Sequence, residues 1–313
     1  MLVTGATGFA GSHLLELVAR LHTPVVATSR RRPEPSGRHR SPHIEWRHLD
    51  VLDRDAVRAT IAEVRPAVVY HLAGAAAVGS SWRHVTRTYA INLMGTHHLL
   101  DALRQAGDEA RVLIPGSAHV YRLSTSPIDE AGDVHPDSPY ALSKLAQELR
   151  ALQPGDRDAV QVLVTRSFNH VGPRQDPSFV GSSFARQIAL IEAGRAEPDL
   201  HVGNLDAIRD FTDVRDTVRA YAMLIERGRP GTLYNVCSGH GRTVRELLDE
   251  LVTLSTAQVR VTVDPSRLRP SDMSTLVGDF GRLRADTGWA PTIPFSQTMH
   301  DLLAYWRTTI AAS

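Results

Sequence analysis

The sequence predicts an α/β protein built on a doubly wound parallel sheet. In the first half of the chain, short apolar runs alternate with segments of helical periodicity. Strands that are buried on both faces read as continuous apolar runs, and their alternation with helices is typical of a parallel sheet covered on both sides. A glycine-rich turn also joins the first apolar run to the first helical segment. With 313 residues, the chain is long enough for about two domains.

The first half contains the elements of the main sheet. Strands are expected at 1–4, 24–29, 44–49, 67–72, 111–116 and 159–166. Helices are expected at 9–21, near 53–64, around 85–106 and after Pro139. The stretch 30–43 is rich in proline, arginine, serine and histidine, which predicts an exposed loop.

The second half is less regular. Helices are expected at 179–193, 213–227, 243–256 and 296–310, with short strands between them. The run 230–239 reads as a last strand that returns to the main sheet. We therefore predict a larger domain over 1–166, to which the chain returns near 206–236, and a smaller α/β domain over 167–313.

The composition excludes several classes of protein. The chain has 35 Lys and Arg residues and 34 Asp and Glu residues. This balance gives no net positive field that would attract a nucleic acid or a membrane surface. The single cysteine, Cys237, allows no internal disulfide and fits a reducing cytoplasm. The N-terminus lacks the pattern of a signal peptide, and the longest uncharged stretch, 66–82, is too short to span a membrane. We expect a soluble, cytoplasmic protein.

A glycine-rich turn follows the first strand and opens the first helix. Residues 3–11 read VTGATGFAG, which places Gly5, Gly8 and Gly11 at intervals of three. Glycines let the backbone turn tightly and approach a pyrophosphate, and the helix N-terminus offers free N–H groups. A plain strand–helix turn needs one glycine rather than three. The pattern predicts a dinucleotide-binding domain of Rossmann type over 1–166, and the smaller domain is then expected to bind the substrate.

The spacing G-x-x-G-x-x-G and three further motifs resemble the extended, nucleotide-sugar branch of the short-chain dehydrogenase/reductases. The further motifs are HLDVLD (48–53), HLAG (71–74) and INLMGT (91–96), and the resemblance covers essentially the whole chain. The residues that it implies for cofactor binding are Gly5, Thr7, Gly8, Phe9, Ala10, Gly11, Ser29, Arg30, Arg31, Asp50, Val51, Leu72, Ala73, Gly74, Tyr140 and Lys144.

The choice of nicotinamide cofactor depends on the end of the second strand. An acidic residue about twenty positions beyond the glycines holds the ribose of NAD, whereas arginine accommodates the 2′-phosphate of NADP. Residues 28–32 read TSRRR, and no acid occurs before Glu34. We therefore expect NADPH, with NADH as an alternative. The arginines also fit a simple solvated loop.

Residues 138–144 read SPYALSK, which places Tyr140 and Lys144 one helical turn apart on the same face. Such a pair alone is usually a surface feature, but here it accompanies the glycine turn. The resemblance implies that Tyr140 exchanges the proton, that Lys144 favours the phenolate and holds the nicotinamide ribose, and that Ser117 in GSAHVY (116–121) holds the substrate oxygen.

His119 departs from the pattern of related dehydratases, which place an acid two residues after the serine. This departure argues against a dehydratase. His119 is interpreted as a partly buried, hydrogen-bonded histidine, with a proton relay as the alternative. The adjacent His97 and His98 are expected to face different sides of their helix and so do not form a metal-binding pair, and the sequence contains no metal motif. Cys237 is interpreted as a core thiol.

Several segments of the second half resemble GDP-4-keto-6-deoxy-D-mannose reductases, the enzymes that form GDP-D-rhamnose. They include RSFNHVGPRQ (166–175), FARQIALIEAG (184–194) and VGNLDAIRDFTDVRD (202–216). Arginine forks match paired phosphate oxygens, although a single arginine also fits a surface ion pair. The residues implied for substrate binding are Ser81, Asn169, Arg186, Arg209, Arg269 and Asp272. The resemblance also implies a homodimer formed through the helices at 85–106 and 138–152.

The leading interpretation is an NADPH-dependent reductase of a GDP-linked 4-keto-6-deoxyhexose. A 4-epimerase or GDP-mannose 4,6-dehydratase on the same scaffold is the alternative enzyme, and nothing local excludes the epimerase. A non-enzymatic NADP-sensing regulator is the alternative of another class. Such proteins usually lose the tyrosine or the lysine, whereas Tyr140 and Lys144 are both present.

Overall fold

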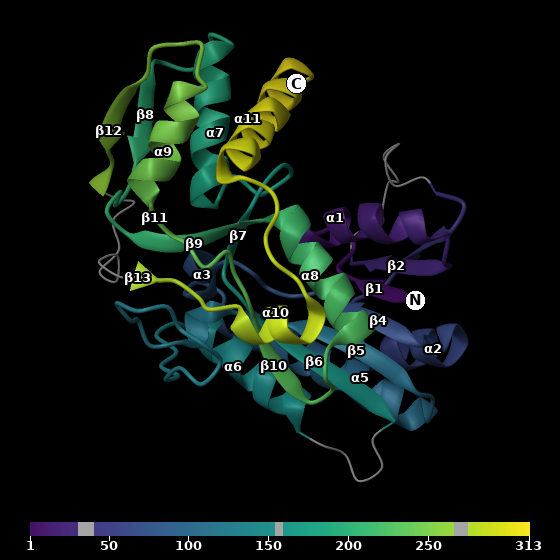
Figure 1. The fold of residues 1–313 in the computed structure, drawn as a ribbon. Coiled ribbons are helices and arrows are strands. Elements are labelled where there is room, and N and C mark those ends of the chain that lie inside the picture. The colour runs from purple at the N-terminus through teal and green to yellow at the C-terminus, as the bar shows by residue number, and fades with distance from the viewer. Residues whose placement is uncertain (31–40, 154–158, 266–274) are drawn as a thin grey trace.

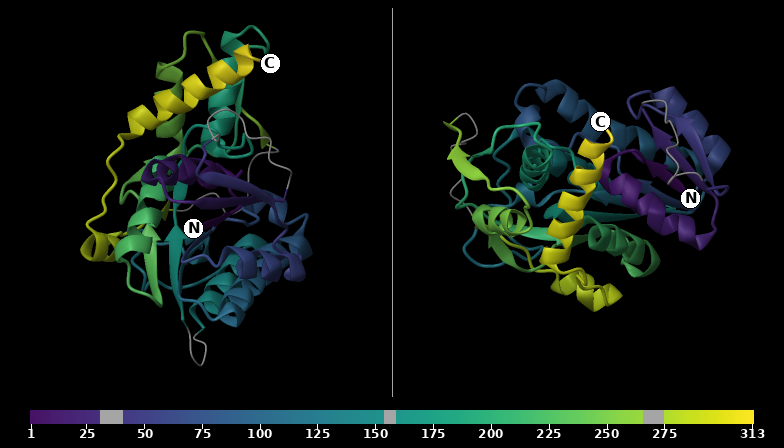
Figure 2. Two further views of the ribbon diagram at one scale, coloured as in Figure 1. Left: turned by 90° about the vertical axis from the view of Figure 1, so that its right-hand side faces the viewer. Right: turned by 90° about the horizontal axis from the view of Figure 1, so that it is seen from above.

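The computed structural model describes residues 1–30, 41–153, 159–265 and 275–313. Two lobes are visible, a larger one built on a wide sheet and a smaller one that carries the C-terminus (Figure 1). Figure 2 shows the same arrangement from two further directions. Within the described residues, no helix combines the length and the apolar character needed to cross a membrane.

The larger lobe contains a seven-stranded sheet in the order β10-β6-β5-β4-β1-β2-β3. Every pairing in this sheet is parallel, as the sequence predicts. Its strands are β1 (Leu2–Thr4), β2 (Val25–Ser29), β3 (Ile44–His48), β4 (Val68–His71), β5 (Ala110–Pro115), β6 (Val160–Ser167) and β10 (Thr232–Val236). Strand order reverses between β1 and β4, and ligands of such sheets bind in the crevice that opens there at the carboxyl ends of the strands.

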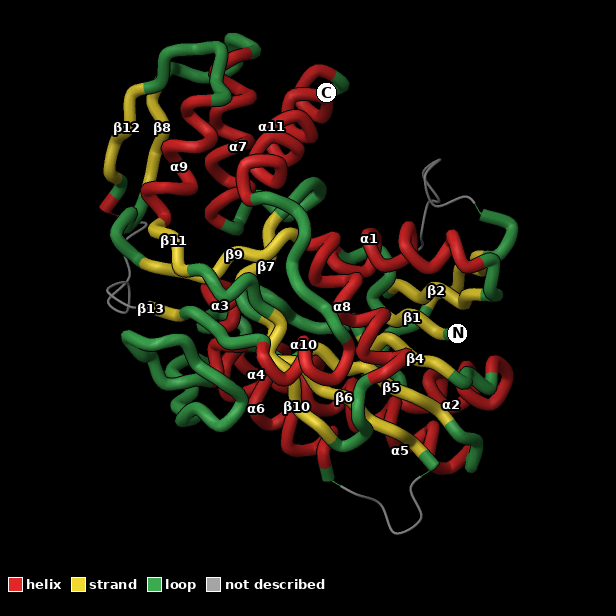
Figure 3. Tube along the Cα trace, viewed as in Figure 1, coloured by secondary structure: helices red, strands yellow, loops and turns green. Residues whose placement is uncertain are grey.

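Helices cover both faces of this sheet, as the red and yellow elements of Figure 3 show. Side chains of a strand point alternately to its two faces. Leu2 of β1 accordingly joins the hydrophobic cluster beneath one helix layer, and the next residue, Val3, joins the cluster beneath the other. One layer contains α1 (Phe9–Val18), α8 (Val214–Arg227) and α10 (Gly281–Thr287), and the other contains α2 (Arg54–Val64), α5 (Gly95–Ala106) and α6 (Pro139–Leu152).

The helix expected over 85–106 is interrupted. It consists of α4 (Val85–Tyr89), a π-helical turn (Ala90–Met94) and α5. A short helix, α3 (Val78–Ser81), precedes it. Turns of π-helix are rare and occur often at functional sites.

The smaller lobe has its own core. Its helices are α7 (Val180–Glu192), α9 (Val244–Thr253) and α11 (Phe295–Ala311). They pack beside a strand pair, β8 (Asp199–Val202) and β12 (Arg260–Val263). A further sheet, made of β7 (Asn169–Val171), β9 (Ile208–Asp213), β11 (Gly241–Thr243) and β13 (Thr275–Leu276), lies between this core and the main sheet (Figure 1).

The chain passes between the lobes more often than its sequence indicates. The boundary that we propose, at residue 167, falls at the end of β6. Within 206–236, β9 belongs to the sheet between the two cores, whereas α8 and β10 belong to the larger lobe. A second return follows in the short helix α10 and the residues after it, where Leu283 and Trp289 are fully buried in the core beneath α8.

Candidate active site

The glycine turn closes tightly against the end of β4. Gly5 has a φ of 66°, which only glycine adopts readily, and a Cβ there would lie 2.6 Å from the backbone nitrogen of Ala73. A Cβ on Gly11 would collide with the carbonyl oxygen of Gly5. Gly8 is the N-cap of α1 and donates its N–H to Gly5. The turn therefore brings bare backbone to the N-terminus of α1, as a pyrophosphate site requires.

The other residues expected to bind a cofactor lie around this turn, at the carboxyl ends of the first four strands. The hydroxyl groups of Thr7 and Ser29 are 3.0 Å apart and join the turn to the end of β2. Arg30 follows Ser29 and is exposed, while Arg31 lies outside the described residues. The remaining members are Phe9 and Ala10 in α1, Asp50 and Val51 after β3, and Leu72, Ala73 and Gly74 after β4.

Ser117 and Tyr140 meet at the carboxyl end of β5. Ser117 caps the short helix that follows this strand, and Tyr140 lies in the first turn of α6. Ser138 caps α6 by accepting the N–H of Ala141, and Pro139 is its first residue. Both reactive side chains are buried, and the side chain of Ser117 counteracts part of the effect of burial on the pKa of Tyr140. Burial raises the pKa of Tyr140, so the phenol is protonated at neutral pH.

Lys144 lies one turn beyond Tyr140, as its spacing predicts. Its ammonium donates to the carbonyl of Pro115 (2.9 Å) and to the side chain of Gln147 (2.8 Å). Burial lowers the pKa of Lys144 to about 8. Within the described part of the chain these two acceptors use two of the three ammonium N–H groups, which leaves one for a ligand hydroxyl.

A buried polar network extends from Lys144 to the glycine turn. Gln147 donates to the hydroxyl of Thr96, which itself donates to the carbonyl of Asn92. His71 lies between Thr96 (3.1 Å) and Thr4 (2.8 Å). Since the hydroxyl proton of Thr96 is already used, Nε2 of His71 must donate and Nδ1 must accept. Burial lowers the pKa of His71 to about 3, which keeps this ring neutral.

The π-helical turn places Asn92 where a regular helix would not. Its side chain accepts the N–H of Ala75 (2.8 Å) and donates to the carbonyl of Ala75 (3.1 Å) and to Ser143 (2.8 Å). It therefore ties the loop after β4 to α6. Neither Asn92 nor Gln147 is among the site residues expected from the sequence, although INLMGT carries both Asn92 and Thr96.

His119 lies against the reactive tyrosine. Its ring centroid is 6.1 Å from that of Tyr140, and the two rings meet edge to face at 76°. Its backbone N–H donates to the hydroxyl of Ser117 (3.2 Å). The side chain is half-buried, as the interpretation from the sequence expects. Its position beside Tyr140 is also the one that the alternative interpretation, a proton relay, requires.

The residues expected to bind substrate occupy several elements. Ser81 is buried, and its hydroxyl accepts the N–H of Tyr140 (3.2 Å) and donates to Val78 (2.6 Å), so in this structure it supports α6. Asn169 in β7 pairs with Phe211, two residues beyond Arg209 in β9. The exposed Arg186 of α7 lies with its guanidinium carbon 5.9 Å from the ring of Trp306.

Arg269 and Asp272 lie outside the described residues. The strand that follows them, β13, pairs Leu276 with Arg209.

Cys237 is fully buried, and burial raises the pKa of its thiol, which keeps the group protonated and unreactive.

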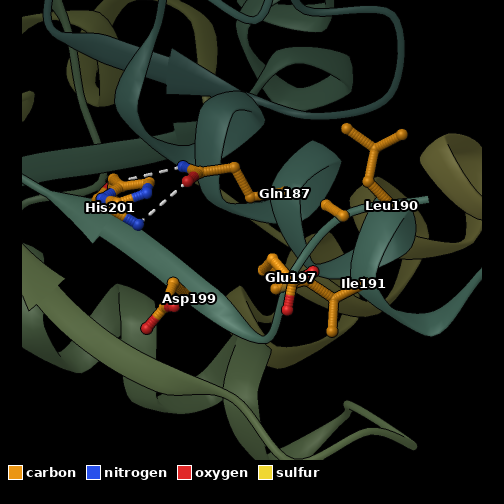
Figure 4. A pocket seen from close by; sticks show the side chains of 7 residues that line it. Gln187, Leu190, Ile191, Glu197, Asp199 and His201 are labelled. Carbon is orange, nitrogen blue, oxygen red and sulfur yellow. Dashed lines mark hydrogen bonds between the residues drawn. The ribbon is translucent and has the colours of Figure 1, made fainter. Parts of the chain in front are cut away.

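A separate cavity of about 310 Å³ lies in the smaller lobe, between α7 and the start of β8 (Figure 4). Gln187 spans one end of it, accepting the N–H of His201 (2.9 Å) and donating to its carbonyl (3.2 Å). The remaining lining residues are Leu190, Ile191, Ala196, Glu197 and Asp199. Because none of the reactive groups faces it, we do not assign the reaction to this cavity.

A phosphate cradle beside a buried Ser–Tyr–Lys set defines an NAD(P)-dependent oxidoreductase of the short-chain dehydrogenase/reductase class. Comparison with known proteins narrows this class. The family model described as GDP-mannose 4,6 dehydratase matches residues 2–302. The chain therefore belongs to this family of nucleotide-sugar enzymes.

Individual relatives differ in their activities. A GDP-6-deoxy-D-mannose reductase of Pseudomonas aeruginosa is 38% identical over 99% of this chain and 98% of its own. A GDP-mannose 4,6-dehydratase of Yersinia enterocolitica is 26% identical over 97% of this chain and 92% of its own. Among solved structures, RMD from Pseudomonas aeruginosa complexed with NADPH shares 37% identity, covers 98% of this chain and 99% of its own, and has a TM-score of 0.85.

Proposed function

We propose that the protein reduces the C4 ketone of GDP-4-keto-6-deoxy-D-mannose with NADPH and forms GDP-D-rhamnose or its C4 epimer. The observation that carries this proposal is the buried, protonated Tyr140, which lies beside Ser117 and one helical turn before Lys144 at the edge of the dinucleotide cradle. A ketone reductase needs a proton donor of this kind at the substrate oxygen. The similarity to the Pseudomonas reductase supports the choice of substrate.

The described residues fit a dinucleotide. A Cβ on Gly5 or Gly11 would collide with neighbouring backbone, so glycine is needed for the tight turn that leads into the N-terminus of α1. These residues would hold the pyrophosphate, and Lys144 would hold the ribose next to the nicotinamide. The reduced nicotinamide supplies the hydride when bound. Exposed Arg30 and the lack of an acid at the end of β2 favour NADPH, the ligand of the similar Pseudomonas structure.

The protein groups then act on the substrate oxygen. Ser117 donates a hydrogen bond to the ketone and orients it beside Tyr140. As negative charge develops on that oxygen, Tyr140 transfers its phenolic proton to it. The ammonium of Lys144, held by Pro115 and Gln147, stabilises the phenolate that remains. Asn169, Arg186, Arg209, Arg269 and Asp272 are proposed to bind the GDP moiety.

A dehydratase is the second candidate, because the matching family model carries that description. The position that bears an acid in such enzymes is His119, whose ring lies against Tyr140. A neutral imidazole can relay a proton, but it offers no carboxylate for the elimination of water. This difference favours the reductase.

We also propose that the protein forms a homodimer in the cytoplasm. Large apolar side chains are exposed just after α3, in α4, in the π-helical turn and in α6, which makes this surface a candidate interface. They are Trp82, Val85, Met94, Leu142 and Leu149. Sedimentation equilibrium of the purified protein tests this proposal, and a monomer at micromolar concentration contradicts it.

Consumption of the cofactor distinguishes the candidate reactions. Incubation with GDP-4-keto-6-deoxymannose and NADPH is expected to oxidise one cofactor per sugar, measured by nicotinamide absorbance, and to yield GDP-rhamnose by NMR. A 6-deoxytalose product would retain the reaction class and correct the stereochemistry. Conversion of GDP-mannose to its 4-keto derivative without net loss of NADPH would identify a dehydratase.

A further inference from the structure

Three residues of the cofactor helix α1 contact one segment that begins in β7. Phe9, His13 and Glu16 are spaced by four and three positions, so they share one face of the helix. All three contact residues 170–174, which comprise the end of β7 and the turn after it and lie about 160 positions later in the chain. We call these contacts the α1 clasp.

Each contact of the α1 clasp is specific. The rings of Phe9 and His170 are stacked at 5.6 Å with an interplanar angle of 12°. Nε2 of His13 lies 2.9 Å from the carbonyl oxygen of Pro173. A carbonyl oxygen can only accept, so Nε2 carries the proton, and burial lowers the pKa of His13 to about 4, which keeps the ring neutral. The hydrogen bond therefore persists over the physiological pH range.

The third contact is a two-pronged ion pair between Glu16 and Arg174. The two nitrogen–oxygen distances are 2.5 and 3.0 Å. Arg174 has a φ of 73°, a left-handed conformation that is uncommon for residues other than glycine. The ion pair thus fixes a backbone that would favour other conformations without it. The planar, two-pronged pair also fixes the orientation of the Arg174 guanidinium relative to the carboxylate of Glu16, which a simple point charge would not do.

The clasped segment is continuous with the proposed substrate site. Asn169 immediately precedes it in β7, which pairs with β9, the strand of Arg209. At its other end, Gln175 donates to the carbonyl of His170 (2.8 Å) and accepts the hydroxyl of Ser182 from α7 (2.6 Å). The segment is therefore held between the cofactor helix on one side and the smaller lobe on the other.

The helix α1 begins at the phosphate cradle. Gly8, at its N-cap, is part of the phosphate cradle, and Phe9 is the first residue of the helix. We propose that the α1 clasp couples the two ligand sites. In this proposal, a dinucleotide in the cradle holds α1 in place, and Glu16 and Arg174 act as positioning residues that hold Asn169 where the diphosphate of the nucleotide sugar binds. This inference rests on the proposed reductase function.

Thermodynamic linkage makes the proposal measurable. If bound NADPH increases the affinity for the GDP moiety, then bound GDP increases the affinity for NADPH by the same factor. GDP is a suitable probe because it carries the diphosphate but no ketone, so NADPH remains intact during the measurement. Calorimetry of GDP binding to the wild-type protein, with and without saturating NADPH, is expected to show tightening of about fivefold or more.

Two variants test the role of the ion pair. Arg174→Gly removes the guanidinium at a backbone conformation that glycine adopts readily, so the fold is expected to persist. Glu16→Gln removes the other charge. In both variants we expect the coupling factor to fall to within about twofold of unity, with NADPH affinity in the absence of GDP unchanged. In turnover, KM for the nucleotide sugar should rise more than kcat falls. Reversal of the pair, Glu16→Arg with Arg174→Glu, should restore part of the coupling.

Asp108→Asn is the matched control. It removes a two-pronged pair with Arg65 of similar geometry (2.7 and 2.5 Å) that lies at the loop before β5, outside the clasp. This variant should leave the coupling at the wild-type value. Equal GDP affinity with and without NADPH in the wild type would contradict the coupling of the two ligand sites. Unchanged coupling in Arg174→Gly would contradict the role of the α1 clasp in it. Neither result would contradict the proposed reductase function. Failure of the wild type to bind GDP at all would overturn the proposed function and the inference together.

Discussion

At the scale of single residues, the proposed reaction depends on the phenol of Tyr140, which stays protonated until negative charge develops on the substrate oxygen. Tyr140→Phe removes this proton but preserves the ring, including its contact with His119. We expect turnover to fall by roughly a hundred- to ten-thousand-fold, the usual contribution of a general acid. The affinity for NADPH should change little. Steady-state kinetics and fluorescence titration measure the two quantities.

Tyr305→Phe, in α11 of the smaller lobe, provides the control for loss of a phenol, and its turnover should equal that of the wild type. Near-normal turnover in Tyr140→Phe would show that another group donates the proton. His119 would then be the first candidate, since its ring lies beside that of Tyr140.

Selectivity for the cofactor is also decided by single residues. Arg30 is exposed at the end of β2, where a 2′-phosphate would lie. Replacement of Arg30 and Arg31 by Ala should weaken NADPH binding by roughly tenfold to a hundredfold, because charge-assisted hydrogen bonds are lost. NADH binding should be nearly unchanged. Arg20→Ala, at an exposed position beyond α1, is the control, and an equal loss for both cofactors in calorimetry would contradict the assignment.

At the scale of elements, the sequence predicts the parallel sheet and most of its helices correctly, but it misses the π-helical turn, α10 and the long-range contacts that join the elements. The spacing of glycines and the runs of apolar residues are local patterns, and they predict local elements. The cradle, α6 and the strands of the larger lobe are therefore predictable from the sequence. The π-helical turn at Ala90–Met94 has the same apolar character as the helices around it, and α10 is a single short helix. The Glu16–Arg174 pair joins residues 158 positions apart, which no local pattern reveals.

The π-helical turn makes a prediction of its own. Asn92→Ala would leave the N–H and carbonyl of Ala75 without their buried partner and release Ser143 of α6. Buried groups left without partners cost about 1–3 kcal/mol each, so we expect a clear fall in the free energy of unfolding. Urea denaturation measures it. Gln105→Ala, which removes an exposed hydrogen bond on α5, should cost much less, and equal effects would contradict a special role for the turn.

At the scale of the whole molecule, the site lies where the two lobes meet. The cradle and the reactive set belong to the larger lobe, whereas Asn169 and Arg209 belong to the sheet that connects it with the smaller one. Two buried histidines lie near the site: His71 beneath the cradle, within the larger lobe, and His13 against Pro173 at the junction. Both are neutral in the folded state, so the stability of the protein depends on pH.

The sign of this dependence follows from the pKa values. Burial lowers the pKa of His13 to about 4 and that of His71 to about 3, below the ordinary value of 6.5. Between these values and 6.5 the unfolded chain binds protons that the folded chain does not, so acid favours unfolding. The contribution of the two histidines to the free energy of unfolding is fully present above pH 6.5 and falls as the pH decreases towards 4. At pH 5 the loss is on the order of 2 kcal/mol per histidine.

His13→Gln isolates one of these contributions. Glutamine can donate to Pro173 as Nε2 of His13 does, but it does not titrate. At pH 8 the variant and the wild type should unfold at similar urea concentrations. At pH 5 the wild type should lose more stability than the variant, by on the order of 2 kcal/mol. The neighbouring charges of Arg174, Glu16 and Asp213 are present in both proteins, so they cancel in the comparison unless they themselves change protonation. Parallel loss of stability in the two proteins from pH 8 to 5 would show that His13 does not cause the acid sensitivity.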